Sequence, residues 1–186
     1  MNILIVGSGG REHAICAAFS RSTRVEKIYC ANGNAGIAQI AECVPIKPDE
    51  IERLSDFAAD RSIDLTFVGG ETSLALGIVD EFENRGLRIL GPNKAAAELE
   101  ASKAFSKDFM ARHGVPTATY RNVDSSDEAI AILSDGVFGD ESAPIVVKAD
   151  GLAAGKGVVV ATNRQEAVDA INDLASIAGE AAAERI

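Results

Sequence analysis

The sequence predicts an α/β fold in which a doubly wound parallel sheet is followed by a smaller α+β unit. Near-continuous apolar runs at residues 2–6, 64–68 and 87–90 carry the first half of this prediction, because strands buried on both faces of a parallel sheet have this pattern. Amphipathic segments separate the runs, as expected of repeated β-α-β units. Two β-branched runs, 145–147 and 158–160, joined by a glycine-rich connection, predict a hairpin in the second unit.

Composition and charge narrow the class of protein. The 186 residues are 47% hydrophobic and 25% charged, as in a globular protein with its own core. The net charge of −10 and the lack of a basic segment argue against a nucleic-acid partner. No apolar run approaches the ~18 residues of a membrane span and no signal pattern opens the chain, so no membrane partner and a cytoplasmic location are expected. Cys16, Cys30 and Cys43 lack metal-ligand spacing and are predicted to be buried or otherwise unremarkable thiols.

The first predicted strand ends in a glycine turn, Gly7-Ser8-Gly9-Gly10, and a helix is predicted from Arg11 onward. This order presents a helix N-terminus, and therefore free backbone N–H groups, to an anion. The dinucleotide fingerprint does not fit, because its third glycine falls at Glu12 and the second predicted strand, 26–30, is followed by Asn32 instead of an acid. The turn is predicted to bind a phosphate of some other ligand; a tight turn without a ligand is the alternative.

Two more glycine-containing turns follow predicted strands, at 32–36 and 69–71. A helix is predicted to begin near Asp49 between them, and a second helix is predicted from Leu74 to Gly86. The carboxyl ends of parallel strands lie at one edge of a sheet, which is where such folds bind ligands. The three turns are therefore predicted to converge in space.

The second half of the chain is predicted to begin after a helical stretch at 93–113, which stops at Gly114. The predicted domains are a substrate domain at 1–101, a helical connector at 102–116 and a second domain at 117–186.

Three elements beside the hairpin are predicted in the second domain. They are a strand near 118–122, a helix that begins at a capping box of Ser125 and Glu128, and a last helix after Thr162.

The connection within the predicted hairpin suits a phosphate chain. Lys148 and Lys156 stand near its ends, and Gly155 and Gly157 leave the backbone around Lys156 open to a ligand. Backbone N–H donors and lysine charges are what phosphates prefer. The pattern G-x-x-x-x-G-K-[ST] does not fit, because Gly151 stands one residue too close to Gly155 and a glycine replaces the final Ser or Thr. The prediction is a hairpin lid over phosphates; an ordinary glycine hairpin with two solvated lysines is the alternative.

Four motifs, in the same order along the chain, resemble the glycinamide ribonucleotide synthetase (phosphoribosylamine–glycine ligase) family of the ATP-grasp superfamily. They are Gly7-Ser8-Gly9-Gly10-Arg11-Glu12-His13-Ala14, Asn32-Gly33-Asn34-Ala35-Gly36, Gly91-Pro92 with Leu99 to Lys107, and Lys148 to Gly157. The resemblance covers nearly the whole chain, and it implies that residues 117–186 are part of an ATP-grasp lid domain.

The resemblance implies a ligase of purine synthesis, which converts glycine, ATP and 5-phosphoribosylamine into glycinamide ribonucleotide, ADP and phosphate through an acyl phosphate. The residues that it implies for ATP are Lys103, Lys148, Asp150, Gly151, Gly155, Lys156 and Gly157, with Lys156 also in a catalytic role. The residues that it implies for the phosphoribosyl group are Gly7, Ser8, Gly9, Gly10, Arg11, Glu12 and Glu71. Magnesium is implied as the partner of ATP, with its ligands expected beyond Ile186 and none in this chain.

The sequence departs from the family pattern in two places. Gly70-Glu71-Thr72-Ser73-Leu74 stands where the family commonly has Gly-Pro-Glu followed by Ala-Pro-Leu, which puts the family's substrate contacts there in question. The chain also stops, at Glu184-Arg185-Ile186, where the family would be starting a strand, and it reads as a truncated N-terminal part that is expected to be inactive alone. Three classes stay open: a ligase cut short, a stand-alone module that binds a phosphorylated ligand, and one half of a split ligase. The oligomeric state is left open as well.

Overall fold

The chain forms two compact units. The computed structural model describes residues 1–151 and 157–182, with side chains as far as 175. The first unit is Met1–Ala101 and the second is Ser102–Ile186. The segment predicted as a connector, 102–116, therefore belongs to the second unit, where most of it is helical.

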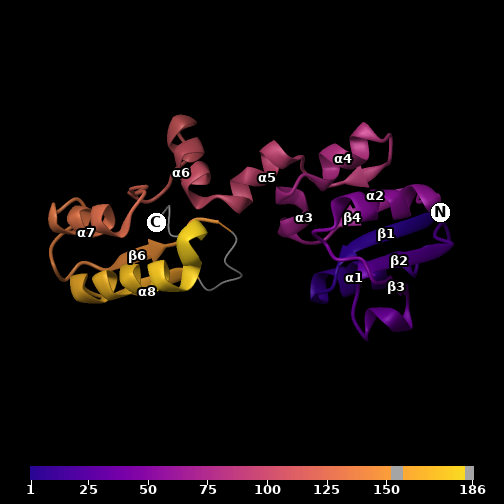
Figure 1. Ribbon diagram of the computed structural model, residues 1–186, viewed down its shortest axis with the longest axis horizontal. Coiled ribbons are helices and arrows are strands. Elements are labelled where there is room, and N and C mark those ends of the chain that lie inside the picture. Colours follow the sequence, from indigo (N-terminus) through magenta and orange to yellow (C-terminus); the bar gives the residue numbers. More distant parts are fainter. Residues whose placement is uncertain (152–156, 183–186) are drawn as a thin grey trace. The chain divides into compact units, whose positions relative to one another are not determined.

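A five-stranded sheet with the order β3-β2-β1-β4-β5 forms the centre of the first unit, and every neighbouring pair of strands is parallel. The strands are β1 (Asn2–Gly7), β2 (Lys27–Asn32), β3 (Glu42–Val44), β4 (Leu65–Val68) and β5 (Ile89–Leu90). The chain runs from β1 outward to β3 and then returns to the other side of β1 for β4 and β5 (Figure 1). This order confirms the predicted doubly wound sheet. Its switch point lies between β1 and β4, and ligands bind outside the carboxyl ends of strands at such a point.

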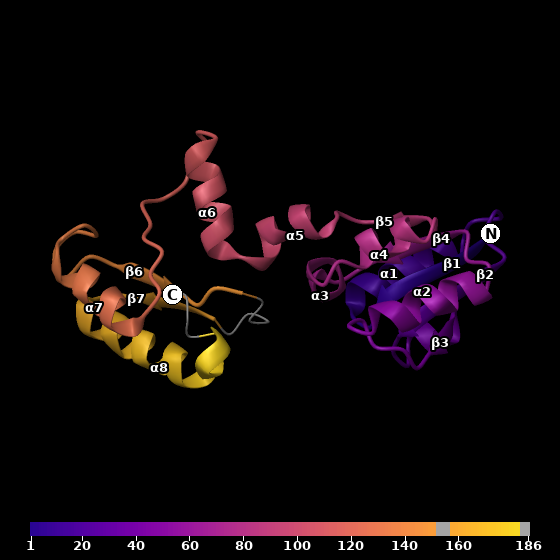
Figure 2. The same cartoon turned by 45° about the horizontal axis from the view of Figure 1, so that its top comes forward.

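Helices cover both faces of this sheet (Figure 2). They are α1 (Gly10–Phe19), α2 (Ile51–Asp60), α3 (Glu71–Ala75), α4 (Ile78–Asn84) and α5 (Lys94–Ala101), with a short 3-10 helix, η1 (Ile37–Gln39). Successive side chains of β1 point to opposite faces and enter two different apolar clusters. Leu4 belongs to the cluster of Leu54 in α2 and Phe82 in α4. Ile5 belongs to that of Cys16 in α1.

The structure of the first unit differs from the prediction in two places. The sequence did not predict β3, because Glu42–Val44 is only three residues long and begins with a charged side chain. The single helix predicted from Leu74 to Gly86 is two helices, α3 and α4. Gly77 separates them with a φ of 91°, and a residue in this left-handed region ends a helix.

The stretch predicted as helical across 93–113 is interrupted at Ser102. This residue is extended, with φ −122° and ψ 118°, and it separates α5 from α6 (Lys103–Arg112). Its Oγ accepts a hydrogen bond from the N–H of Phe105 at 3.0 Å, which is the bond of a helix N-cap. Along the sequence, the boundary between the two units falls at this interruption.

The second unit packs two helices on one face of an antiparallel hairpin (Figure 1). The hairpin strands are β6 (Ile145–Lys148) and β7 (Val158–Ala161), and the helices are α7 (Ser126–Ser134) and α8 (Arg164–Ala182). Val147 and Ala161 point into the core, together with Leu133 of α7 and Ile171 of α8. The predicted α+β character and the hairpin are both confirmed. The predicted cap of α7 is also present, since Ser125 Oγ accepts from the N–H of Glu128 at 3.2 Å.

The strand predicted near 118–122 does not form. Side chains attach this segment to α6 instead: Tyr120 Oη and Asn122 Nδ2 donate to Asp108 Oδ1 at 2.9 and 3.0 Å. The sheet of this unit has two strands in the described residues, β6 and β7, so the segment has no strand to pair with. Its β-branched and aromatic composition misled the prediction, because a strand is stabilised only by its neighbours.

Within the part of the chain that the structure describes, no helix has the length and apolar character needed to cross a membrane.

Candidate functional site

The turn after β1 brings the N-terminus of α1 to the carboxyl edge of the sheet. Gly7 has a φ of 134°, a conformation that residues with a Cβ avoid. Gly9 is the N-cap of α1. The N–H groups of Gly10 and Arg11 have no acceptor among the described residues, so they remain available to an anion.

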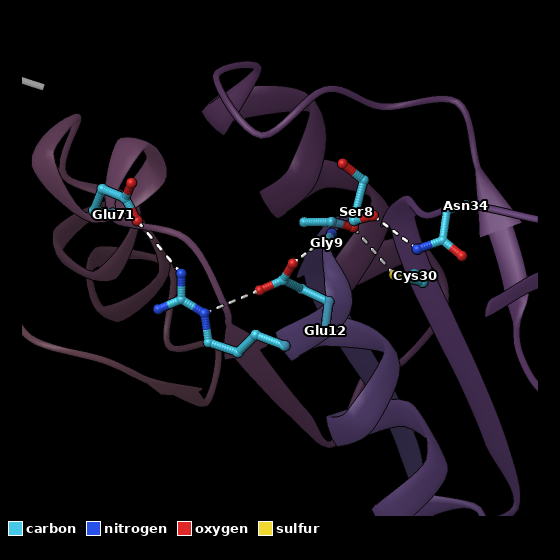
Figure 3. A network of polar contacts seen from close by, with 8 residues as sticks. Ser8, Gly9, Glu12, Cys30, Asn34 and Glu71 are labelled. Carbon is cyan, nitrogen blue, oxygen red and sulfur yellow. Dashed lines mark hydrogen bonds and ion pairs between the residues drawn. The ribbon is translucent and has the colours of Figure 1, made fainter. Parts of the chain in front are cut away.

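The three glycine-containing turns converge, as predicted (Figure 3). Asn34 Nδ2 donates to the carbonyl of Ser8 at 2.7 Å, which joins the turn after β2 to the turn after β1. The N–H of Gly69, in the turn after β4, donates to the carbonyl of Val6 at 3.0 Å. Asn34 also organises its own turn, because its Oδ1 accepts from the N–H groups of Gly36 and Ile37, both at 2.9 Å. No role for Asn34 was predicted from the sequence.

Glu12, Arg11 and Glu71 form a line of charges across this edge (Figure 3). Glu12 is 5% exposed, and its Oε2 accepts from the N–H of Gly9 at 2.6 Å. Its Oε1 lies 3.5 Å from Arg11 Nε, and Arg11 Nη2 lies 3.6 Å from Glu71 Oε2. The Gly9 amide, expected to face a ligand phosphate, is therefore occupied by a side chain of its own turn.

The segment that departs from the family pattern begins α3. Ser73 is buried, and its Oγ donates to the carbonyl of Pro48 at 2.6 Å, so this hydroxyl holds α3 against the loop before α2. Glu71, the first residue of α3, has a side chain that is about half exposed and directed toward Arg11 (Figure 3). Of the departing residues, Ser73 has a structural contact, while Glu71 lies at the shared edge.

In the second unit, Asp150 connects the end of β6 to the N-terminus of α6. Its Oδ1 accepts from the N–H of Lys103 at 2.5 Å and of Ala104 at 3.3 Å, and its Oδ2 accepts from Ser102 Oγ at 2.9 Å. Lys103 Nζ donates to the carbonyl of Gly151 at 2.7 Å. Three of these residues, Lys103, Asp150 and Gly151, were predicted to bind ATP. No role was predicted for Ser102, although a serine before a helical run is an N-cap signal.

These contacts determine the protonation of Asp150. Burial acts to raise the pKa of its carboxyl group. The hydrogen bonds from Ser102 Oγ and from the backbone N–H groups of Ala104, Gly151 and Lys103 outweigh burial, so the pKa lies below its usual value. The carboxylate is therefore the form that holds α6.

Lys148 lies on the outer face of the hairpin. The buried side chains of β6, Ile145 and Val147, alternate with outward ones. Beside Lys148 on that outer face stand Val146, Val158 and Val160, which are 49%, 44% and 68% exposed. An apolar strip with a lysine at one end suits a ligand that has a flat apolar part and a phosphate chain.

Part of the predicted lid lies outside the described residues, including Gly155 and Lys156. Gly157 is described, and its carbonyl accepts from the N–H of Ala149 at 2.8 Å, which extends the hairpin pairing by one bond. No group of three or more His, Cys, Asp or Glu side chains that could hold a metal ion occurs in the described parts of the chain.

Each unit of the chain matches a model of a known protein family. Residues 101–186 match the family model described as phosphoribosylglycinamide synthetase, ATP-grasp (A) domain, so the second unit is of the ATP-grasp class. Residues 1–100 match the model for the N domain of the same synthetase. The chain belongs to the phosphoribosylglycinamide synthetase family.

Two curated relatives are phosphoribosylamine–glycine ligases. The one from Caldanaerobacter subterraneus is 51% identical over 172 residues, which are 92% of this chain and 40% of the relative. The one from Pseudomonas aeruginosa is 51% identical over 183 residues, which are 97% of this chain and 41% of the relative. The chain thus spans about 40% of the length of these relatives.

Solved structures also match the chain. Phosphoribosylamine–glycine ligase from Thermotoga maritima matches with a TM-score of 0.68 at 28% identity, over 91% of this chain and 38% of that one. The biotin carboxylase domain of a 2-oxoglutarate carboxylase from Hydrogenobacter thermophilus matches with a TM-score of 0.74 over 97% of this chain and 42% of that one. At 21% identity, the second match shows the fold alone.

Proposed function

We propose that this chain supplies the phosphoribosyl site and one side of the ATP site of a ligase that joins glycine to 5-phosphoribosylamine in purine synthesis. The observation that carries the proposal is the identity of about half of the residues to phosphoribosylamine–glycine ligases across both units. ATP would convert the glycine carboxylate into an acyl phosphate. The amine of the sugar would then attack the acyl carbon, and phosphate would leave.

The turn after β1 is the proposed phosphoribosyl site. The N–H groups of Gly10 and Arg11 and the positive end of α1 would bind the phosphate. The Arg11 side chain is 66% exposed, so its guanidinium would reach the same group by turning away from Glu71. Glu71 would accept a hydrogen bond from a ribose hydroxyl. Gly7, Ser8, Gly9 and Glu12 would shape the turn without giving up their own contacts.

The second unit is the proposed ATP side of the site. Lys148 would bind a phosphate, and the strip of Val146, Val158 and Val160 would pack against the adenine ring. Lys103, held at the start of α6 by Asp150, would bind a second phosphate by exchanging the carbonyl of Gly151 for a phosphate oxygen. Gly155, Lys156 and Gly157 are proposed to cover the phosphates, as the resemblance implies.

Magnesium is proposed to accompany ATP, and it would offset charge on the transferring phosphoryl group. The described residues do not fit it, because both oxygens of Asp150 are engaged with α6. Its ligands would have to come from residues outside the described parts of the chain. We also propose a cytoplasmic location, since the substrates are charged metabolites.

The experiment is an assay of ADP release that depends on both glycine and 5-phosphoribosylamine. It uses the full-length protein that contains this sequence. Lys148→Ala should lower turnover roughly 10²-fold, because a charged group next to the transferring phosphate is lost. Lys47→Ala, which removes an exposed lysine of the first unit, is the control and should leave turnover unchanged. ADP release that needs neither substrate, or equal effects of the two variants, would refute the proposed function.

A further inference from the structure

Glu12 is a buried carboxylate inside a turn whose glycines otherwise mark an anion site. It takes the position at which a dinucleotide-binding turn has its third glycine, where close packing of helix on strand is needed. A glutamate fits here because its side chain folds back under the turn. Its Oε2 reaches the Gly9 amide at 2.6 Å, and the residue is 5% exposed.

Three glycines make room for this carboxylate. A Cβ atom on Gly7 would lie 2.6 Å from Glu12 Cγ, one on Gly9 would lie 2.9 Å from Oε2, and one on Gly69 would lie 2.1 Å from Oε1. The neighbouring Gly70 differs, since a Cβ there would meet nothing within 4 Å. Gly69, which belongs to the turn after β4, thus compensates for the glycine that is absent at position 12.

The charge of Glu12 changes what the turn can accept. Its Oε2 occupies the Gly9 amide, and its Oε1 has no hydrogen-bond donor in the described residues, only Arg11 Nε at 3.5 Å. The amides of Gly10 and Arg11 remain open, which is enough for one phosphate group. A second phosphate at the inner end of the turn would lie against the Glu12 carboxylate. Two negative charges in contact repel each other strongly.

We propose that Glu12 determines the specificity of the first turn: its carboxylate permanently fills the inner end of the glycine cradle, so that the turn takes a single phosphate ester and rejects the pyrophosphate of a dinucleotide. The identity of that ester as a phosphoribosyl group rests on the proposed function. The exclusion of pyrophosphate rests on the contacts of Glu12 itself.

Amide NMR spectra of the isotope-labelled 186-residue chain test the preference, because they locate binding at Gly10 and Arg11. Ribose 5-phosphate should shift these signals in the wild type, whereas NAD⁺ at the same concentration should not. Glu12→Gly should lower the preference for ribose 5-phosphate over NAD⁺ by roughly tenfold or more. Glu128→Gly is the matched control, since Glu128 is the third residue of α7 and also accepts a backbone N–H, from Asp124 at 3.1 Å. It should leave the preference unchanged.

Binding of NAD⁺ to the wild-type turn, or an unchanged preference in a folded Glu12→Gly chain, would overturn the inference. If Glu12→Gly does not fold, Glu12→Gln takes its place, because it keeps an acceptor for Gly9 and removes the charge. Ribose 5-phosphate should then bind more tightly than to the wild type, and an equal or weaker affinity counts against the inference.

A stability cycle tests the packing without any ligand. Gly69→Ala should lower Tm by several degrees in the wild type and by less than half as much in Glu12→Gly, because the clash with Oε1 is gone. Gly70→Ala is the control and should not change Tm. An equal loss in both backgrounds would overturn the inference. If ribose 5-phosphate shifts no signals in the wild type, the proposed substrate site is refuted instead. The stability cycle would still test whether the Glu12 carboxylate fills the inner end of the turn.

Discussion

At the scale of single residues, the second unit depends on Asp150, which receives three hydrogen bonds from the start of α6. Asp150→Ala leaves these donors without their acceptor, so we expect the free energy of unfolding of this unit to fall by about 1–3 kcal/mol. Urea denaturation followed by circular dichroism measures the change. Asp60→Ala, at the exposed end of α2, is the control and should change it by less than about 0.5 kcal/mol. Equal losses would show that Asp150 does not hold α6.

The lowered pKa of Asp150 also predicts a dependence on pH. A carboxyl group whose pKa is lower in the folded state stabilises that state fully above the unfolded pKa, which is about 3.9 for aspartate. The contribution is lost as pH falls from there through the folded pKa. The difference in stability between the wild type and Asp150→Asn should therefore be constant above about pH 5 and shrink below about pH 4. A difference that grows on acidification would contradict this sign.

The three cysteines should differ in reactivity. Cys16 and Cys30 are fully buried, whereas Cys43 is partly exposed. A hydrogen bond with Cys16, together with burial, raises the pKa of Cys30, and the thiolate is the form that reacts. Iodoacetamide should therefore modify Cys43 alone in the native protein and all three cysteines after unfolding, as counted by mass spectrometry. Rapid modification of Cys30 in the native state would contradict its burial.

At the scale of elements, Gly77 separates α3 from α4. Its φ of 91° is costly for a residue with a Cβ, so Gly77→Ala should destabilise the first unit by about 1–2 kcal/mol. Gly10→Ala is the matched control, because Gly10 is the first residue of α1 and a Cβ there would meet nothing within 4 Å. Thermal unfolding compares the two variants. A control as unstable as Gly77→Ala would argue against backbone conformation as the cause.

The sequence predicts the elements that carry their own signal. β1 and β4 are continuous apolar runs, and α7 begins at its predicted capping serine. Ser102 also carries a local signal, a serine before a helical run, but its contact with Asp150 was not predictable because Asp150 lies in a different element. The strand predicted at 118–122 was wrong for a related reason, because a strand is stable only beside a neighbouring strand.

In the candidate site, too, features with a local signal were predictable and features that depend on distant residues were not. The glycines after β1 and the topology of a doubly wound sheet predict that the turns converge. Whether Glu12 faces a ligand or the interior depends on Gly69, in a turn from another strand. The spacing from Gly9 to Glu12 is that of a capping box, which is a local signal, but the room that Gly69 provides lies far away in the sequence.

At the scale of the whole molecule, each unit has its own core. We expect calorimetry to resolve two unfolding transitions. Gly77→Ala should lower the first unit's transition temperature and Asp150→Ala that of the second. If each variant lowered both transitions equally, the units would unfold as one cooperative body. Ribose 5-phosphate should raise only the transition that Gly77→Ala lowers, since a ligand stabilises the unit that binds it.

The outer face of the β6–β7 hairpin has a practical consequence for handling the protein. The side chains of three valines, Val146, Val158 and Val160, are exposed to solvent on this two-stranded sheet. Flat apolar strands of this kind tend to associate with copies of themselves. Concentrated solutions of the 186-residue chain should therefore form soluble oligomers that light scattering detects. Val160→Lys adds a charge to the most exposed of the three and should raise the concentration at which the protein stays monodisperse. We therefore expect the surface proposed to receive a nucleotide to limit the concentration at which the isolated chain stays in solution.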